Sequence, residues 1–363
     1  MLIFYVVFFF LILRFAISLF NFISNPKLTP TARHYTDLVS ILIPARNEED
    51  SILQLLESIK NQDYQNYEVI VLDDNSSDST YQLCAEFSDT DERFHVVKGE
   101  ELAEGWLGKN YACHQLSKLA RGRYLIFLDA DTYIAGGLLN NSVHRMKMGH
   151  LELLSLFTNQ VMKTTGERLV VPLMHFLLLN LLPLRLVRLS KNPSFSAASG
   201  QFMMFNADTY HVHQWHAQVK DKVVEDIEIV KLIKAYQYKT ESLLANGYIF
   251  CRMYHSYKEA IAGFSKNLLA GFNNNIAALI CYLLLVMLGP IFIALYLDVE
   301  LLLFAFTLTI LARLMISLQS GQNAFLNIIL HPFQMLTLLV VSVLSVQKFL
   351  TKTVTWKGRS VNP

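Results

Sequence analysis

Residues 124–131 (YLIFLDAD) constrain the fold more than any other stretch of the chain. Five apolar or aromatic residues run directly into two carboxylates, Asp129 and Asp131. This is the pattern of a buried β-strand that ends at a charged site, although a turn containing two aspartates is an alternative interpretation. Alternate residues of a strand point to one face, so both carboxylates are expected to face one ligand at the carboxyl end of a sheet. Two hard oxygen ligands, completed by water and phosphate oxygens, suit Mg²⁺ or Mn²⁺.

The composition indicates a membrane protein with a soluble middle. Apolar residues make up 53% of the 363 residues and charged residues 17%, and most of the apolar excess lies at the two ends. The 31 basic and 30 acidic residues nearly balance, so no nucleic-acid partner is expected. The four cysteines are scattered, which indicates buried thiols in a reducing compartment rather than disulfides or a zinc site.

Residues 2–20 form an apolar run of about the length that crosses a bilayer, interrupted by Arg14. A cleaved signal peptide is the alternative, but no basic residue precedes the run, so we favour an uncleaved transmembrane anchor over residues 1–24. Lys27 and Arg33 follow the run. By the positive-inside rule they place the following domain in the cytoplasm, at the plasma membrane.

Residues 36–250 have the pattern of an α/β domain. Short strands rich in β-branched and aromatic residues alternate with polar helical stretches, which predicts a mainly parallel sheet with helices on both faces. The four clearest strands are VSILIP (39–44), YEVIVLDD (67–74), RFHVV (93–97) and RYLIFLDAD (123–131).

Polar residues follow the first two strands. Pro44 stops the first, and residues 47–50 open an amphipathic helix. The second strand ends in Asp73 and Asp74, followed by small polar residues that can cap the next helix. Adjacent aspartates at a strand end are also placed to accept hydrogen bonds from a base or a ribose, and we favour that role for these two.

A glycine-punctuated loop at residues 104–110 carries Trp106 and Lys109 just before a helical stretch. It is not a Walker A loop, because the required spacing and the following Ser or Thr are absent. A lysine at a helix start is still a good partner for a diphosphate, since it adds a charge to free backbone N–H groups.

Two further segments are expected in the membrane interface. Residues 168–188 are apolar enough for a span, but they include two prolines, a histidine and an asparagine. A span here would also place everything after it across the membrane from Asp131, so an amphipathic interfacial segment fits better. Residues 251–274 predict a second interfacial helix, with Lys258 and Lys266 on its polar side.

Two candidate acceptor segments lie between them. Small residues precede Gly200 and Gln201 and allow close approach of a ligand or of a neighbouring strand, and both interpretations stay open. Glu225 and Asp226 begin another helical stretch, where the helix dipole alone favours acidic residues. Neighbouring helical residues diverge by about 100°, so at most one of these two carboxylates is expected to face a common site squarely.

Residues 275–350 form a C-terminal transmembrane or re-entrant region. Its apolar runs lie at 276–297, 299–319 and 325–347. With the anchor, four full spans would leave the basic tail at 351–363 outside, against the positive-inside rule. Either the last run is re-entrant or interfacial, or the charge rule fails here.

Four short motifs occur in order between residues 38 and 272. They are Pro44-Ala45-Arg46-Asn47-Glu48, Asp73-Asp74-Asn75-Ser76-Ser77-Asp78-Ser79-Thr80, Asp129-Ala130-Asp131 and Glu225-Asp226. The series resembles the membrane-bound family 2 glycosyltransferases, which have the GT-A fold. Three further segments resemble the branch of hopene-associated and carotenoid (diaponeurosporenoate) glycosyltransferases. These are Gly105-Trp106-Leu107-Gly108-Lys109, the small residues before Gly200-Gln201, and the closing Trp356-Lys357-Gly358-Arg359.

The resemblance implies a role for each motif. The nucleotide of a nucleotide-diphosphate sugar, with a UDP-sugar expected, would be held by Pro44, Arg46, Glu48, Asp73 and Asp74. Asp131 and Asp129 would hold the metal and the diphosphate, with Lys109 offsetting phosphate charge, and Asp226 would be the general base. On the acceptor side we expect Gly200, Gln201, Glu225 and Lys266.

The chain also departs from part of that family. The Q-x-x-R-W motif of processive polysaccharide synthases is absent, so transfer of a single sugar to a membrane lipid is expected. The resemblance implies a lipid such as a carotenoid or a hopanoid as the acceptor. A single displacement would invert the anomeric carbon. The alternatives are a processive synthase, a polyprenyl-phosphate sugar transferase, and a non-catalytic membrane protein that only binds a nucleotide-sugar.

Overall fold

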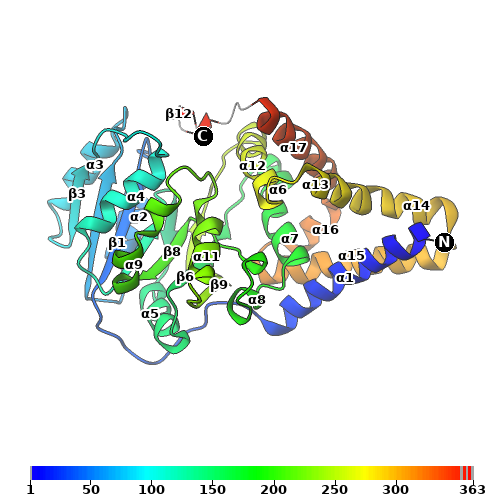
Figure 1. Ribbon diagram of the computed structural model, residues 1–363, viewed down its shortest axis with the longest axis horizontal. Coiled ribbons are helices and arrows are strands. Elements are labelled where there is room, and N and C mark those ends of the chain that lie inside the picture. Colours follow the sequence, from blue (N-terminus) through cyan, green and yellow to red (C-terminus); the bar gives the residue numbers. More distant parts are fainter. Residues whose placement is uncertain (1, 352–354, 357–358, 361–363) are drawn as a thin grey trace.

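The computed structural model describes residues 2–351, 355–356 and 359–360. Lys357 and Gly358 of the closing motif lie outside the described residues, as do most residues of the basic tail. The rest forms two parts that Figure 1 shows side by side: a sheet with helices on both faces, and a group of long apolar helices that carries the N-terminus at its far end.

A seven-stranded sheet forms the first part, in the order β3-β2-β1-β4-β8-β6-β9. Its strands are β1 Val39–Ala45, β2 Tyr67–Asp73, β3 Phe94–Lys98, β4 Tyr124–Leu128, β6 Leu153–Phe157, β8 Phe202–Asn206 and β9 Thr240–Leu244. Six strands pair in parallel with a neighbour: β1 with β2 and β4, β2 with β3, and β6 with β9. The seventh, β8, runs antiparallel to β4 and β6. The prediction of an α/β domain with a mainly parallel sheet is therefore confirmed, including all four strands placed from the sequence.

Helices cover both faces of this sheet, which explains why its central strands are apolar along their whole length. Side chains such as Ile41 and Val71 pack on one face against α2 (Ile52–Lys60), α3 (Thr80–Ser88) and α5 (Leu138–Gly149). Residues such as Leu42 and Phe127 pack on the other face against α4 (Gly108–Leu119) and α11 (Glu225–Ala235). The second core continues without a break into the apolar helices, so the two parts share one hydrophobic interior.

Short elements complete the part of the molecule around the sheet. A three-stranded sheet of β5 (Thr132–Ile134), β10 (Ile249–Cys251) and β7 (Asn159–Gln160) begins immediately after Asp131. The short helices are α6 Thr165–Val170, α7 Pro172–Leu181, α8 Leu186–Leu189, a 3₁₀ turn Pro193–Phe195, α9 Ala207–His213 and α10 Trp215–Gln218.

Residues 168–188 therefore form broken helices rather than one span. α7 has 10 residues, about half of what a bilayer requires. Its interfacial position stays a prediction, as does that of α12 (Tyr257–Gly271).

Four helices among the described residues are long and apolar enough to cross a membrane. They are α1 (Leu2–Ser24), the stretch Ile276–Tyr296, α15 (Val299–Gln319) and α17 (His331–Thr351). In the second of these, α13 (Ile276–Leu283) and α14 (Gly289–Tyr296) are joined by a π-helical turn. The predicted N-terminal and C-terminal apolar helices are thus present.

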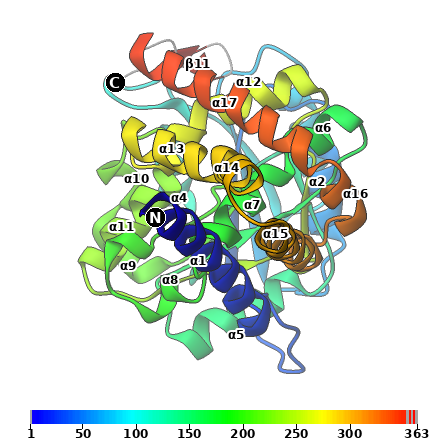
Figure 2. The same ribbon diagram turned by 90° about the vertical axis from the view of Figure 1, so that its right-hand side faces the viewer.

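The last apolar run differs in direction from the others. It is split into α16 (Ala324–Ile329) and α17, and Figure 2 shows α15 nearly end-on while α17 lies across the view. α17 packs along α12, where the Leu269 N–H donates to Ser345 Oγ at 3.1 Å and Lys348 Nζ donates to the Ala262 carbonyl at 3.0 Å. Since α17 is also long and apolar enough to cross a membrane, both alternatives for the last run stay predictions.

Candidate active site

The loops after β1 and β2 form a small polar cavity at the carboxyl end of the sheet. Arg46 Nη1 donates to the carbonyl oxygens of Asp74 and Asn75, and the Glu48 N–H donates to Thr80 Oγ1 at 2.8 Å, so each loop holds the other. The cavity has a volume of about 120 Å³. Its lining residues are Pro44, Ala45, Arg46, Glu48, Asp74, Lys109, Ala112, Asp129, Ala130 and Asp131.

Asp73 lies apart from this group. It is the last residue of β2 and is 6% exposed, and its Oδ2 accepts a hydrogen bond from the Ser76 N–H at 3.3 Å. Eight residues are predicted to hold the nucleotide, the diphosphate or the metal, and Asp73 is the one of them that does not line the cavity. Its role at the nucleotide stays a prediction.

A second cavity of about 940 Å³ adjoins the first, and Lys109, Asp129 and Asp131 line both. Its polar end also contains Gly200, Gln201, Glu225, Asp226 and Lys266. The far walls are apolar side chains of α7 and of the second half of α12. These are Met174, Leu177, Leu178, Leu181, Leu182, Phe264, Leu268 and Phe272.

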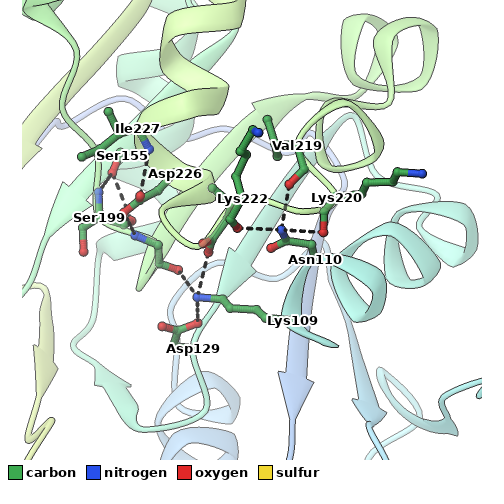
Figure 3. A network of polar contacts seen from close by, with 12 residues as sticks. Lys109, Asn110, Asp129, Ser155, Ser199, Val219, Lys220, Lys222, Asp226 and Ile227 are labelled. Carbon is green, nitrogen blue, oxygen red and sulfur yellow. Dashed lines mark hydrogen bonds and ion pairs between the residues drawn. The ribbon is translucent and has the colours of Figure 1, made fainter. Parts of the chain in front are cut away.

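Lys109 joins three segments that are distant in the sequence (Figure 3). Its Nζ lies 2.7 Å from Asp129 Oδ1 and 3.4 Å from Glu225 Oε1, and it donates to the Gly200 carbonyl at 3.4 Å. On the other side of Gly200, its N–H donates to Asp226 Oδ2 at 2.9 Å. The end of β4, the start of α4, the small-residue segment and the start of α11 thus meet at one point.

Glu225 and Asp226, the first two residues of α11, both face this point, in contrast to the expectation that at most one would. A Cβ atom on Gly200 would meet Glu225 Oε1 at 3.2 Å and Asp226 Oδ2 at 3.8 Å. The longer glutamate side chain at the first helical position reaches around the helix start. A side chain at position 200 would press on Glu225 and on Lys109 Nζ, at 3.1 Å, whereas its contact with Asp226 would be an ordinary one. A glycine at position 200 therefore eases the close approach of Lys109 and Glu225.

Burial and charge shift the pKa values of the two central groups. Burial and the neighbouring Glu225 carboxylate raise the pKa of Asp226 to about 7, against the backbone N–H groups of Ile227 and Gly200 and the Lys109 ammonium. Burial alone would lower the pKa of Lys109, but Asp129 and Glu225 hold it well above its ordinary value. The site therefore contains a fixed cation beside a carboxylate that titrates near neutrality, which is suited to accepting a proton.

Comparison with known proteins agrees with this geometry. Residues 40–212 match the model of the Glycosyl transferase family 2. This chain contains a family 2 glycosyltransferase domain. It is 26% identical over 269 residues to the 4,4'-diaponeurosporenoate glycosyltransferase of Staphylococcus haemolyticus, covering 70% of this chain and 68% of that protein. The chain is thus a glycosyltransferase, and the resemblance noted from its motifs is confirmed.

Two further relatives differ in how much they cover. The beta-monoglucosyldiacylglycerol synthase of Trichormus variabilis is 35% identical over 126 residues, which is 33% of this chain and 26% of the synthase. The mannosyltransferase PcManGT from Pyrobaculum calidifontis, solved in complex with GDP-Man and Mn²⁺, superposes with a TM-score of 0.57 at 16% identity, covering 96% of this chain and 99% of that one. This structural likeness shows the GT-A type of fold for the glycosyltransferase.

The glycosyltransferase site also depends on Asn110, a residue that the sequence did not single out. Its Nδ2 donates to the carbonyl oxygens of Val219, Lys220 and Lys222, at 2.9, 3.3 and 3.1 Å (Figure 3). This side chain fastens the start of α4 to the loop that leads into α11 and so sets the position of Asp226 relative to Lys109. An asparagine next to a lysine gives no signal in the sequence that it serves this purpose.

Two residues at the floor of the glycosyltransferase cavity have internal partners. Gln201 is 5% exposed; its Oε1 accepts a hydrogen bond from Thr158 Oγ1 at 2.6 Å, and its Nε2 donates to Cys251 Sγ at 3.0 Å. Tyr254, also missed, lines the cavity against Gly263 of α12, where a Cβ would lie 2.2 Å from the tyrosine hydroxyl. The acceptor role of Gln201 stays a prediction, and its amide acts in the structure as a brace.

The two carboxylates after β4 fit a divalent cation that is shared with a ligand. No cluster of three or more His, Cys, Asp or Glu side chains with ligand spacing occurs in the described part of the chain. We therefore do not expect a site in which protein side chains supply all the ligands of a cation. Asp129 and Asp131 offer hard oxygen atoms at the border of both cavities. The remaining ligands would come from diphosphate oxygens and water, as Mg²⁺ and Mn²⁺ allow.

Proposed function

We propose that this glycosyltransferase moves one sugar from a nucleotide-diphosphate sugar to a membrane lipid, with inversion and without polymerisation. The donor is expected to be a UDP-sugar and the metal Mg²⁺ or Mn²⁺. The observation that carries this proposal is the adjoining pair of cavities, one polar and one with apolar walls, which share Lys109, Asp129 and Asp131. A polar donor and an apolar acceptor would then meet at Asp226.

The polar cavity suits the nucleotide-sugar donor. Arg46, Glu48 and Asp74 surround it and supply charged partners for a nucleoside. Lys109 lies at its border and is held in the charged form, so it would stabilise the negative charge that develops on the departing diphosphate. A metal held by Asp131 and Asp129 would supply further charge stabilisation at the phosphates.

The larger cavity suits a lipid acceptor. Asp226 lies at its polar end, and its pKa near 7 allows it to take the proton of an acceptor hydroxyl at neutral pH. Attack from the side opposite the diphosphate, in one displacement, inverts the anomeric carbon. The apolar walls from α7 and α12 exclude water, which would otherwise compete as the acceptor.

The relatives support a lipid acceptor. Their names give diaponeurosporenoate and diacylglycerol derivatives as what those enzymes glycosylate or make, and both classes are apolar molecules. The wall of leucines in α7 suits such molecules better than it suits a growing polysaccharide. A carotenoid, a hopanoid or another membrane lipid is the acceptor class that we propose, at the cytoplasmic face of the plasma membrane.

The proposal is tested by lipid analysis. Lipids extracted from cells with the protein, without it, and with an Asp226→Asn variant are compared by mass spectrometry. We expect one glycolipid that carries a single added sugar to be present with the wild-type protein alone. Products with many sugars would indicate a processive synthase, a sugar on a polyprenyl phosphate would indicate the transferase alternative, and unchanged lipids would leave the binding-protein alternative.

The orientation is tested by cysteine labelling. Asp89 lies between α3 and β3, and Gln218 ends α10, so the two positions flank the segment 168–188. Single cysteines at these positions should be accessible from the cytoplasm alone to a membrane-impermeant reagent. Opposite accessibility would separate Asp131 from Asp226 by a membrane and overturn the proposed site.

A further inference from the structure

A cluster of aromatic and basic side chains lies away from the active site, where five helices meet. Each helix supplies one residue: Arg14 of α1, Phe176 of α7, Tyr282 of α13, Arg313 of α15 and His331 of α17. Phe176 is central: the guanidinium carbon atoms of Arg14 and Arg313 lie 5.5 and 4.6 Å from its ring centre, and the His331 ring lies 5.5 Å from it. Arg14 also lies 5.9 Å from the Tyr282 ring.

In the part of the chain that the structure describes, these two arginines have no carboxylate partner. Neither forms an ion pair among the described residues, and α1, α7, α13 and α17 contain no acidic residue. Glu300 of α15 is 13 residues from Arg313, about 20 Å along a helix. Two cations thus share one ring in an apolar surrounding without a counter-ion.

The hydrogen bonds that the two arginines form go to neutral groups. Its Nη2 donates to Gln334 Oε1, and its Nε to the Asn327 carbonyl at 3.4 Å. Arg14 Nε donates to Asn180 Oδ1. Within the described residues, Arg313 Nη1, the Tyr282 hydroxyl and His331 Nδ1 have no hydrogen-bond partner, although Arg313 is 1% and Tyr282 5% exposed.

Burying a cation without a counter-ion costs more than cation–π contacts and neutral hydrogen bonds return. An anion between these groups would remove that deficit and satisfy the remaining donors together. Arg14 as a whole residue has intermediate exposure, so we expect an anion to enter beside α1. If α1 spans the bilayer, its exposed side faces lipid rather than water.

The cluster lies below the helix ends that adjoin the catalytic part. α1 and α15 end together there, where Gln319 Nε2 donates to the Asn21 carbonyl at 2.5 Å. Arg14 lies ten residues before the end of α1 and Arg313 six residues before the end of α15, about 15 and 9 Å along the helices. A phosphate group that binds both arginines would therefore lie below the level of these helix ends.

We propose that this five-helix cluster binds the phosphate group of an anionic membrane lipid. The lipid would hold α7, whose other face lines the large cavity, against α1, α15 and α17. This binding is separate from sugar transfer and does not depend on the proposed function.

The test uses the purified full-length protein in a maltoside detergent that contains no phosphate. Phosphatidylglycerol is added in one arm, diacylglycerol with the same acyl chains in the second, and inorganic phosphate alone in the third. Thermal unfolding and retained lipid, measured by native mass spectrometry, are followed. We expect phosphatidylglycerol alone to stay bound and to raise the unfolding midpoint, because a ligand of the folded state stabilises it.

Variants show whether the cluster is responsible. Arg14→Gln and Arg313→Gln should each weaken phosphatidylglycerol binding by about 10- to 100-fold, the loss expected for a hydrogen bond to a charged group. Tyr282→Phe, which removes one hydroxyl, should weaken it less. Lys27→Gln makes the same change in charge just beyond the end of α1, outside the cluster, and should bind as the wild type does.

Three results would overturn the proposal. Equal stabilisation by diacylglycerol would show that acyl chains alone suffice. Equal weakening in Lys27→Gln would show non-specific attraction to charge, and the same stabilisation by inorganic phosphate would show an ion site without a lipid. If Arg313→Gln does not fold, Arg14→Gln and Tyr282→Phe still decide, since unchanged binding in both contradicts the assignment.

Discussion

The two adjoining cavities of the active site are built in opposite ways. The small cavity is formed by loops after parallel strands, and its side chains are mostly charged. The large cavity is formed by α7, α11 and α12, and its far walls are apolar. The difference indicates that the sheet presents a polar ligand while the helices beside the membrane present an apolar one, with Lys109, Asp129 and Asp131 between them.

Asp131 should show the largest effect, because it belongs to both cavities. Asp131→Ala removes a carboxylate placed for the metal, so the transfer rate should fall by about 10⁴-fold as charge on the departing phosphate goes unneutralised. A chelator should abolish transfer by the wild-type protein, and Mg²⁺ or Mn²⁺ should restore it. Rates with purified protein and donor are measured by lipid product formation; full turnover in the chelator would contradict the metal-assisted mechanism.

Asp226 should separate chemistry from donor binding. Asp226→Asn keeps size but cannot accept a proton, so the rate should fall by about 10²- to 10⁴-fold with donor affinity nearly unchanged. Glu225→Gln is the matched control and should cost less unless Glu225 orients the base or binds the acceptor, because its carboxylate pairs with Lys109 in the structure. A loss of donor affinity in Asp226→Asn, at an intact saturated rate, would make the carboxylate a donor ligand.

The same residue predicts a pH dependence. A base must be deprotonated to act, and the pKa of Asp226 is raised to about 7, so kcat/KM should fall as pH decreases below about 7 and level off above it. The Asp226→Asn variant should lack this limb. A wild-type profile that is flat from pH 5 to 8 would exclude a base with that pKa.

The polar cavity was predictable from the sequence because its parts follow strands directly. Alternating and apolar patterns placed β1, β2 and β4, and the carboxyl ends of neighbouring parallel strands share one edge of a sheet. Residues such as Arg46, Asp74 and Asp131 therefore came together as expected. Asp73 did not, because adjacent strand residues point to opposite sides, and one of the two carboxylates turns away from the cavity.

The large cavity was less predictable because it depends on tertiary contacts. Asn110 bonds to carbonyl groups more than 100 positions away, and Tyr254 fits against α12 only because residue 263 is glycine. The cluster around Phe176 requires five helices to meet. Sequence patterns mark helix faces but not which faces meet, so Arg14 was noted as an interruption of an apolar run and its neighbours were not found.

A donor-side change should affect donor binding alone. Asp74 is 7% exposed and lines the polar cavity. Asp74→Asn keeps its shape but removes its charge, so KM for the nucleotide-sugar should rise about 10-fold or more, as for the loss of one charge-assisted hydrogen bond. KM for the lipid should stay constant. If lipid KM rises equally, the two cavities are not separate binding sites.

An acceptor-side change should do the reverse, with the smallest effect of the series. Leu178 lies in the apolar wall of the large cavity, and Leu178→Trp would fill part of it, so KM for a long-chain lipid should rise about 5-fold, in line with the modest cost of overpacking an apolar site. Donor KM should not change.

Leu189→Trp adds the same side chain at a position of α8 that is 71% exposed and does not line the cavity, and it should behave as the wild type. Shorter acceptors should be affected less by Leu178→Trp, because they would not reach that wall. If Leu178→Trp alters donor KM instead, or if Leu189→Trp has the same effect on lipid KM, then α7 does not form the acceptor wall and the division between a polar and an apolar cavity fails.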